Sequence, residues 1–324
     1  MLHLQSDKQK LLFYGLGFTL FLSAILMFTE GIFAYFVSHS NTEQTGKINL
    51  VMQHQIDTEL MIFGSSVAEV GFDTKVLEQD LNLSAYNMAI DGTPISGSEF
   101  LTNEFLDYTQ NCKTIVIGMA FFSLGDLNLM NAPERYLAHK TNPHVKDNFK
   151  KISPSLYNKL YHVPFYSFIV ANHTYYKNAF IGAKNSLKNI ALDNDPLKGF
   201  VPHYSDYEDT RESLKNLEAI SISKTTMETY TAIIEKIKAK GITPVLVITP
   251  MYIQGQQSFS NYNEYLTAVE SLSEQTHTTF FDFSTHAIVN DENYFYNNGH
   301  LNASGALKFT EAVSDSLKIV IHGN

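Results

Sequence analysis

The sequence has little of several features that often define a protein's chemistry. It contains one cysteine, Cys112, and no tryptophan among 324 residues. A single thiol excludes an internal disulfide and a cysteine-rich zinc site, and the strand-like residues after Cys112 predict a buried structural thiol. Basic residues are also few, because 23 Lys and Arg stand against 33 Asp and Glu with no basic run. This balance argues against nucleic acid as a partner.

A long apolar run lies near the N-terminus. Residues 11–37 carry one formally charged side chain, Glu30, and exceed the ~20 residues that cross a bilayer, so we predict one transmembrane helix. Lys8 and Lys10 precede the run, whereas the next basic residue is Lys47. The positive-inside rule then places the N-terminus in the cytoplasm and the remainder outside. This predicts a single-pass protein of the cell membrane with an extracytoplasmic domain.

A cleaved signal peptide is the alternative for this region. Ser38 and Ser40 are small residues of the kind that a signal peptidase reads. The apolar run is about twice the usual length of a signal-peptide core, which favours an anchor.

We divide the chain into a cytoplasmic tail (1–10), the anchor (11–37), a polar stalk (38–57) and one extracytoplasmic domain (58–324). In the domain, apolar runs of strand length alternate with helix-like segments. The expected strands are 59–63, 85–90, 114–120, 243–249 and 279–283, and the expected helices are 74–81 after an Asp73 N-cap, 96–108, 225–240, 261–274 and 303–317. Such alternation predicts an α/β fold with a parallel sheet covered on both faces.

Residues 121–211 interrupt this alternation and are rich in Tyr, Asn, Lys and His. We interpret them as an insertion over the carboxyl edge of the sheet, where open α/β folds place their ligands. The insertion would serve as a lid, as a substrate-binding subdomain or as a docking surface for another protein.

Two short motifs at opposite ends of the domain carry candidate chemistry. Residues 62–66, Ile-Phe-Gly-Ser-Ser, predict a strand entering a glycine turn, where Ser66 would project its hydroxyl at the top of the sheet and its N–H toward an oxyanion. Residues 297–305 precede a helix and contain His300, which on such a loop can act as a general base. Each motif alone is weak, because Gly-Ser-Ser is common in loops and the chain has 12 histidines.

Together and in this order, the motifs resemble those of the SGNH (GDSL-like) hydrolase superfamily. The resemblance covers residues 56–317, with Ser65 in the place of the family's Asp. Supporting stretches are residues 86–92 (Tyr-Asn-Met-Ala-Ile-Asp-Gly), residues 241–250, and His300-Leu301-Asn302 followed by Gly305, the form seen in membrane-anchored members. The resemblance implies a flavodoxin-like, three-layer sheet and no cofactor or metal.

The resemblance also implies roles for individual residues. Ser66 would be the nucleophile and His300 the base, and the N–H groups of Ser66 and Gly92 would line an oxyanion hole. Asn297 stands three residues before the histidine, where the family has an acid, and the Asn of the third family block is not evident in residues 118–123. An Asn can orient an imidazole by a hydrogen bond but cannot stabilise the imidazolium by charge.

Two other residues are candidate sources of the missing carboxylate. Asp282 and Asp291 lie before the histidine motif, although neither occupies the matching position. Asp282 ends a predicted strand and is expected to cap a turn.

The combination of one N-terminal helix, a Gly-Ser-Ser turn and a His-Leu-Asn motif resembles the DltD, AlgJ and AlgX types, which work beside membrane-bound O-acyltransferases. It implies a serine esterase or O-acyltransferase that acts on acyl groups of a cell-surface polysaccharide. Asn297 favours an alternative, a catalytically degenerate assembly or binding protein for such a transferase or polymer. A metalloenzyme is disfavoured, because His139 and His144 lie five apart without a nearby Cys or an HExxH pattern.

Overall fold

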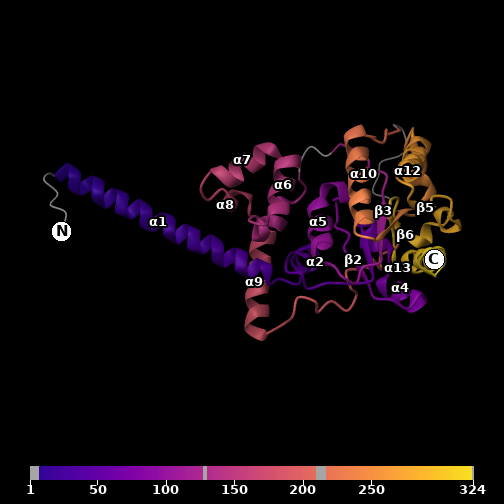
Figure 1. Ribbon diagram of the computed structural model, residues 1–324, viewed down its shortest axis with the longest axis horizontal. Helices are drawn as coiled ribbons and strands as arrows, with labels where there is room; N and C mark the ends of the chain where they lie inside the picture. Colours follow the sequence, from indigo (N-terminus) through magenta and orange to yellow (C-terminus); the bar gives the residue numbers. More distant parts are fainter. Residues whose placement is uncertain (1–6, 127–129, 209–216, 323–324) are drawn as a thin grey trace.

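The structure is a computed structural model, and it describes residues 7–126, 130–208 and 217–322. Residues 1–6 of the predicted tail and residues 127–129 and 209–211 of the predicted insertion lie outside these ranges. The described residues build a domain around one central sheet, from which a long N-terminal helix extends (Figure 1).

The central sheet has five parallel strands. Its order, β2-β1-β3-β4-β5, is that of flavodoxin-like doubly wound folds. The strands are β1 (Leu60–Phe63), β2 (Ala85–Asn87), β3 (Thr114–Met119), β4 (Thr243–Ile248) and β5 (Thr279–Asp282). Each lies within a stretch that the sequence predicts as a strand, and the predicted α/β fold with a parallel sheet is confirmed.

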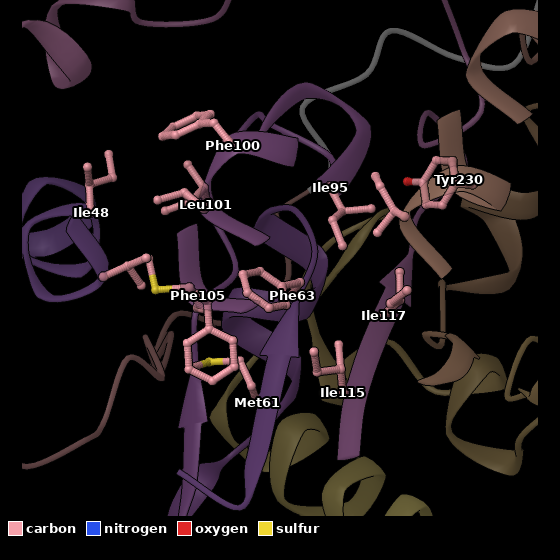
Figure 2. Close-up of a cluster of buried hydrophobic side chains, with 14 of the residues drawn as sticks. Ile48, Met61, Phe63, Ile95, Phe100, Leu101, Phe105, Ile115, Ile117 and Tyr230 are labelled. Carbon is pink, nitrogen blue, oxygen red and sulfur yellow. The ribbon is translucent and has the colours of Figure 1, made fainter. Parts of the chain in front are cut away.

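Helices cover both faces of the sheet and give three layers. Along β1 the side chains alternate, so that Met61 and Phe63 enter one hydrophobic cluster while Leu60 and Ile62 enter another. All four are fully buried, which explains why the strands read as continuous apolar runs. Figure 2 shows the first cluster, in which Phe63 meets the edge of Phe105.

The helices fall into two groups according to the cluster they complete. The first cluster is covered by α2 (Glu43–Met52), α5 (Glu99–Tyr108), α10 (Lys224–Ala239) and α12 (Tyr262–Thr276). The second is covered by α3 (Ser66–Gly71), α4 (Thr74–Leu81) and α13 (Ala303–His322). The predicted start of α4 is confirmed, because the Asp73 carboxylate accepts the N–H of Lys75 at 3.0 Å.

Short elements complete the connections around the sheet. They are η1 (Ile95–Gly97), α11 (Ile253–Gln257), η3 (Ala287–Asn290) and η4 (Glu292–Tyr294), followed by a hairpin of β6 (Phe295–Asn297) and β7 (His300–Leu301). The hairpin precedes α13 and carries the histidine motif.

One helix, α1 (Asp7–Ser38), contains the whole apolar run and extends away from the domain (Figure 1). It is long and apolar enough to cross a membrane. Its first two thirds expose their side chains, whereas its last turns pack on the domain, where Val37 is buried and Glu30 pairs with Lys140. The apolar run therefore has an exposed part and a part that belongs to the domain.

The structure contradicts the polar stalk predicted over residues 38–57. Within that stretch α2 is built into the domain, with Ile48 and Leu50 fully buried and Lys47 and Asn49 buried beside them. Asn49 Nδ2 donates to Val37 O at 2.7 Å and so joins α2 to the end of α1. The sequence of α2 shows little apolar periodicity because polar residues share its buried face. Their hydrogen-bond partners, such as Glu69 for Lys47, lie elsewhere in the sequence.

The insertion also differs from its predicted placement. It forms η2 (Pro133–His139), α6 (Pro143–Ile152), α7 (Pro154–His162), α8 (Ser167–Val170) and α9 (His173–Lys188). These helices pack on one another and on α1, α2 and α5, between α1 and the sheet domain in Figure 1. Its η2 and the segment after α9 reach the loops at the carboxyl edge of the sheet, where Arg135 Nη1 of η2 donates to Asp91 O and Val201 N–H donates to Glu69 O.

Candidate active site

Ser66 lies in the turn from β1 into α3, at the carboxyl edge of the sheet. Gly64 permits this turn, because a Cβ on it would lie 2.6 Å from the Cβ of Ala68 and 2.9 Å from Gly118 O. As the first residue of α3, Ser66 has an N–H without an intrahelical acceptor, and this N–H donates to no other described residue. The turn thus leaves the Ser66 N–H available for a ligand.

His300 meets Ser66 although 234 positions separate the two residues in the sequence. The Ser66 Oγ lies 2.8 Å from His300 Nε2, and His300 Nδ1 lies 3.0 Å from Asn297 Oδ1. Asn297 ends β6 and His300 begins β7, so the hairpin itself holds the second pair. All three side chains are partly exposed. The structure therefore brings three of the predicted site residues into one chain of hydrogen bonds.

The hydrogen bonds of Asn297 determine the tautomer of His300. The N–H of Gly299 donates to the same Asn297 Oδ1, at 2.9 Å, so the amide oxygen rather than the amide nitrogen faces the ring. That oxygen requires a proton on Nδ1 of the neutral imidazole. Nε2 of this tautomer carries no proton, so it can accept the Ser66 hydroxyl proton, as a general base must.

Two further rings stack in a row beside the His300 imidazole. Tyr296 stacks on His300 with the centroids 5.3 Å apart, and His203 stacks on Tyr296 at 4.1 Å. Burial raises the pKa of Tyr296 to about 12, so its phenol stays neutral near pH 7. The carbonyl of His203 accepts the N–H of Ala303 at 2.6 Å, which fixes this segment to the start of α13. Sequence reasoning missed both aromatic residues, since no motif marks them.

Gly92, the second predicted oxyanion donor, lies on the loop after β2. This loop runs beside the serine turn, because Ile90 N–H donates to Gly64 O at 3.0 Å. Gly92 has φ +68°, a conformation that favours glycine, and a Cβ there would lie 2.4 Å from Asn131 Nδ2. Its N–H donates to no acceptor in the described part of the chain.

Asn131 is a second residue that sequence reasoning missed. Its Nδ2 donates to Gly92 O at 3.2 Å, so an amide side chain lies against the proposed oxyanion loop. The Asn of the third family block is expected within residues 118–123, whereas Asn131 follows the end of β3 by twelve residues. The available signal was an Asn in the segment after β3, but its contact with Gly92 depends on the fold.

A polar cluster of buried Lys47 and Glu69 with partly buried Gln44 connects α2 to both loops of the site. Lys47 Nζ lies 2.7 Å from Glu69 Oε1 and 2.9 Å from Ala89 O, and Gln44 Nε2 donates to the same carboxylate oxygen at 2.6 Å. Gln44 Oε1 also accepts the N–H of Asp91 at 3.2 Å. Burial lowers the pKa of Lys47, and the Glu69 carboxylate opposes this shift. The cluster therefore joins the helix of Ser66 to the loop of Gly92.

A small recess borders the residues next to Ser66 and His300. Its volume is about 10 Å³, close to the lower limit for one water molecule. It is lined mainly by apolar side chains from the ends of β3 and β4, together with Val67 and Gly299. The recess has no room for a long chain.

The two other candidate carboxylates serve local turns. Asp282 Oδ1 accepts the N–H of Ser284 at 2.8 Å, and Asp291 Oδ1 accepts that of Asn293 at 3.1 Å. The predicted turn-capping role of Asp282 is confirmed. Asn297 Oδ1, by contrast, lies 3.0 Å from His300 Nδ1.

The remaining candidates have structural partners. His139 Nε2 lies 2.7 Å from Asn49 Oδ1, whereas His144 Nε2 lies 2.8 Å from an Asp107 carboxylate oxygen. Cys112 is partly buried, and burial raises the pKa of its thiol to about 12. Each of the two histidines thus binds a different side chain.

The residues after His300 shape the start of α13. Asn302 Oδ1 accepts the N–H of Gly305 at 3.0 Å and so caps the helix. A Cβ on Gly305 would lie 2.1 Å from Tyr294 O. The His-Leu-Asn motif and its following glycine therefore position the histidine hairpin against α13.

No protein-family model matches this sequence, and no curated protein does. Among solved structures it is similar to a protein named as a platelet activating factor from Streptococcus pneumonia, with 11% identity, a TM-score of 0.44, and coverage of 85% of this chain and 90% of that one. It is also similar to the psychrotrophic esterase EstA from Pseudoalteromonas sp., with 12% identity, a TM-score of 0.41 and coverage of 82% and 99%. A third, a protein named as lipolytic and of the G-D-S-L family from Desulfitobacterium hafniense DCB-2, has 11% identity, a TM-score of 0.39 and coverage of 79% and 98%.

At these identities and TM-scores the similarities carry no argument about activity. The chemistry rests on the residues of this chain. A serine hydroxyl, a histidine in the tautomer of a base and two N–H groups on adjacent loops are together the parts needed for nucleophilic acyl transfer.

Proposed function

We propose that this protein is an SGNH-type serine esterase or O-acyltransferase that acts on short acyl groups of a cell-surface polysaccharide. The observation that carries the proposal is the hydrogen-bond chain from Ser66 Oγ through His300 to Asn297. The proposed setting is the cell membrane, with α1 as a single-pass anchor and the domain on the extracytoplasmic side. A membrane-bound O-acyltransferase is the proposed partner.

In the proposed reaction, Ser66 Oγ forms a bond to the carbonyl carbon of the acyl donor while His300 Nε2 takes the hydroxyl proton. The N–H groups of Ser66 and Gly92 stabilise the oxyanion of the tetrahedral intermediate. The intermediate then breaks its bond to the leaving oxygen, which receives the proton from His300. Water or a sugar hydroxyl attacks the acyl-serine by the same steps in reverse order, giving hydrolysis or transfer.

The small recess beside the site supports a short acyl group. A volume of about 10 Å³ is near the lower limit for one water molecule, so a fatty chain would have to lie outside the recess. Acetyl esters are therefore the proposed class of acyl donor or product.

The test compares the full chain in detergent with Ser66→Ala and His300→Ala, using p-nitrophenyl acetate as the acyl donor. The full chain is used because Val37, in the last turn of α1, and Ser40, just after it, are buried in the domain. We expect turnover and acylation of Ser66 in the wild type, and loss of both in the two variants. Equal turnover by Ser66→Ala would refute the proposed nucleophile.

A second candidate function is that of a non-catalytic assembly or binding protein for a membrane-bound O-acyltransferase or a surface polymer. It is favoured by Asn297, because a neutral amide does not stabilise the imidazolium by charge. The same assay separates the two functions. A wild type that neither turns over the ester nor becomes acylated at Ser66 would support the assembly function.

A further inference from the structure

The end of α1 crosses α9 at close range. Gly182 makes this crossing possible, because a Cβ on it would lie 1.7 Å from Phe36 O. Asn185 Nδ2 donates to His39 O at 3.1 Å, so the contact continues into the turn after α1. In Figure 1, α9 crosses the end of α1 obliquely. A bilayer crossed by α1 would therefore lie beside α9, nearest to the part of α9 around Tyr176, which contacts Phe33.

The outer face of α9 points along α1 toward its N-terminus. Tyr176 meets Phe33 edge to face, with the ring centroids 5.3 Å apart, and Phe33 lies one turn closer to the N-terminus than Phe36. Phe180 and Leu187 follow Tyr176 by four and eleven residues, which puts all three on one stripe of the helix. Tyr176, at the start of this stripe, therefore lies next to the part of α1 that leads to its exposed segment.

The stripe is apolar and uncovered. Phe180 is 75% exposed and Leu187 is 85% exposed, and on the neighbouring helix α8 Ile169 is 72% exposed. Isolated apolar residues on a surface need no explanation, but here they align on the face of one helix. The apolar surface continues from α1 onto α9.

Positive charge lies along one edge of this stripe in a protein that is acidic as a whole. The chain carries a net charge of −10, yet residues 140–188 contain eight Lys and, of the acidic residues, only Asp147. Lys177, Lys184 and Lys188 are exposed on α9 itself, which contains no acidic residue. An apolar stripe edged by lysines is the pattern of a helix that lies in the interface of an anionic bilayer.

The distances along α1 agree with this placement. At 1.5 Å per residue, about 20 residues span the ~30 Å hydrocarbon core, so a core beginning at Lys10 ends near Thr29. The crossing at Phe36 then lies roughly 10 Å beyond the core, at the level of the headgroups. Aromatic and aliphatic side chains of α9 reach the boundary from there.

We infer that α9 is an interfacial helix that seats the domain on anionic lipid headgroups through Tyr176, Phe180 and Leu187 with Lys177, Lys184 and Lys188. This inference rests on the proposed membrane anchor and is independent of the proposed ester chemistry. The seated helix would give the domain a second membrane contact beside α1 and so fix its orientation on the bilayer.

The absence of tryptophan from the chain gives a direct test. Phe180→Trp places a single Trp on the stripe, and Ile319→Trp is a matched control, because Ile319 is 74% exposed on α13 at the other end of the molecule (Figure 1). Leu22→Trp in α1 reports the anchor. Each full-length variant is reconstituted in vesicles of phosphatidylcholine with or without phosphatidylglycerol, and quenching by brominated lipid is measured.

We expect strong quenching of Leu22→Trp in both lipids, strong quenching of Phe180→Trp in the anionic vesicles, and none of Ile319→Trp. Replacing Lys177, Lys184 and Lys188 by Gln should reduce the quenching of Phe180→Trp, because each lysine near an anionic surface favours the seated state roughly fivefold. Quenched Leu22→Trp with unquenched Phe180→Trp would overturn the inference while leaving the anchor, and would point to a protein partner for the stripe. Unquenched Leu22→Trp would overturn the anchor and the inference together.

Discussion

Replacing Asn297 by Asp should make the enzyme faster, and the structure gives the reason. Asn297 Oδ1 already accepts from His300 Nδ1 at 3.0 Å and from Gly299 N–H at 2.9 Å. An Asp carboxylate oxygen can accept both bonds without moving the hairpin. The substitution therefore leaves the tautomer of His300 unchanged and adds a negative charge beside the imidazolium that forms in the transition state.

The magnitude follows from the change in one hydrogen bond. A bond to a charged group contributes about 1.5–3 kcal/mol, against about 0.5–1.5 kcal/mol for a neutral pair. A difference of about 1–2 kcal/mol in the transition state corresponds to a rate increase of roughly 5- to 30-fold. Asn297→Ala removes the acceptor and should slow the reaction by about tenfold or more, since His300 loses its orientation.

The assay is kcat/KM for p-nitrophenyl acetate, measured on the full chain in detergent for the wild type, Asn297→Asp and Asn297→Ala. Thermal unfolding of all three checks that the hairpin is intact. If Asn297→Asp is no faster than the wild type while the Ser66-dependent reaction is measurable, Asn297 does not act on His300 in the way we infer. An Asn297→Ala variant as active as the wild type would lead to the same conclusion.

Three further predictions concern how the domain is held together. Lys47→Met leaves the Glu69 carboxylate buried without its cation and should lower the free energy of unfolding by about 3–5 kcal/mol. The double variant Lys47→Met/Glu69→Leu should recover most of this loss. A loss below about 1 kcal/mol in urea unfolding would contradict the prediction. Burial lowers the pKa of His139 from 6.5 to about 4. The folded state therefore keeps its full stability above pH 6.5, where His139 is neutral in both states, and loses about 3 kcal/mol of the free energy of unfolding as the pH falls from 6.5 to 4. His139→Gln should flatten that part of the stability profile, and an unchanged profile would assign the acid sensitivity elsewhere. Gly182→Ala should destabilise the crossing of α1 and α9 and raise protease cleavage there, whereas Gly31→Ala, with open space around it, should be neutral or slightly stabilising; equal behaviour of the two variants would argue against the crossing.

Much of the fold could be predicted from the sequence because its signals are local. Strands buried on both faces read as continuous apolar runs, as in residues 60–63 and 243–248, and their alternation with helices requires parallel pairing. The Asp73 cap and the apolar length of α1 are equally local features. The motif positions of Ser66 and His300 were visible in the same way, as residues on loops at the ends of predicted elements.

Tertiary structure alone decided the position of α2 and the geometry of the site. Lys47 reads as a solvent-exposed residue in a polar stretch, and it is buried only because Glu69 and the Ala89 carbonyl meet its ammonium group. Asn297 reads as a defect in a triad, yet the N–H of Gly299 turns its oxygen toward the imidazole and selects the tautomer of a base. Periodicity and motifs determine which elements form, because they depend on neighbours along the chain. Buried polar contacts depend on partners that the fold brings together from distant parts of the sequence, so no local sequence pattern predicts them.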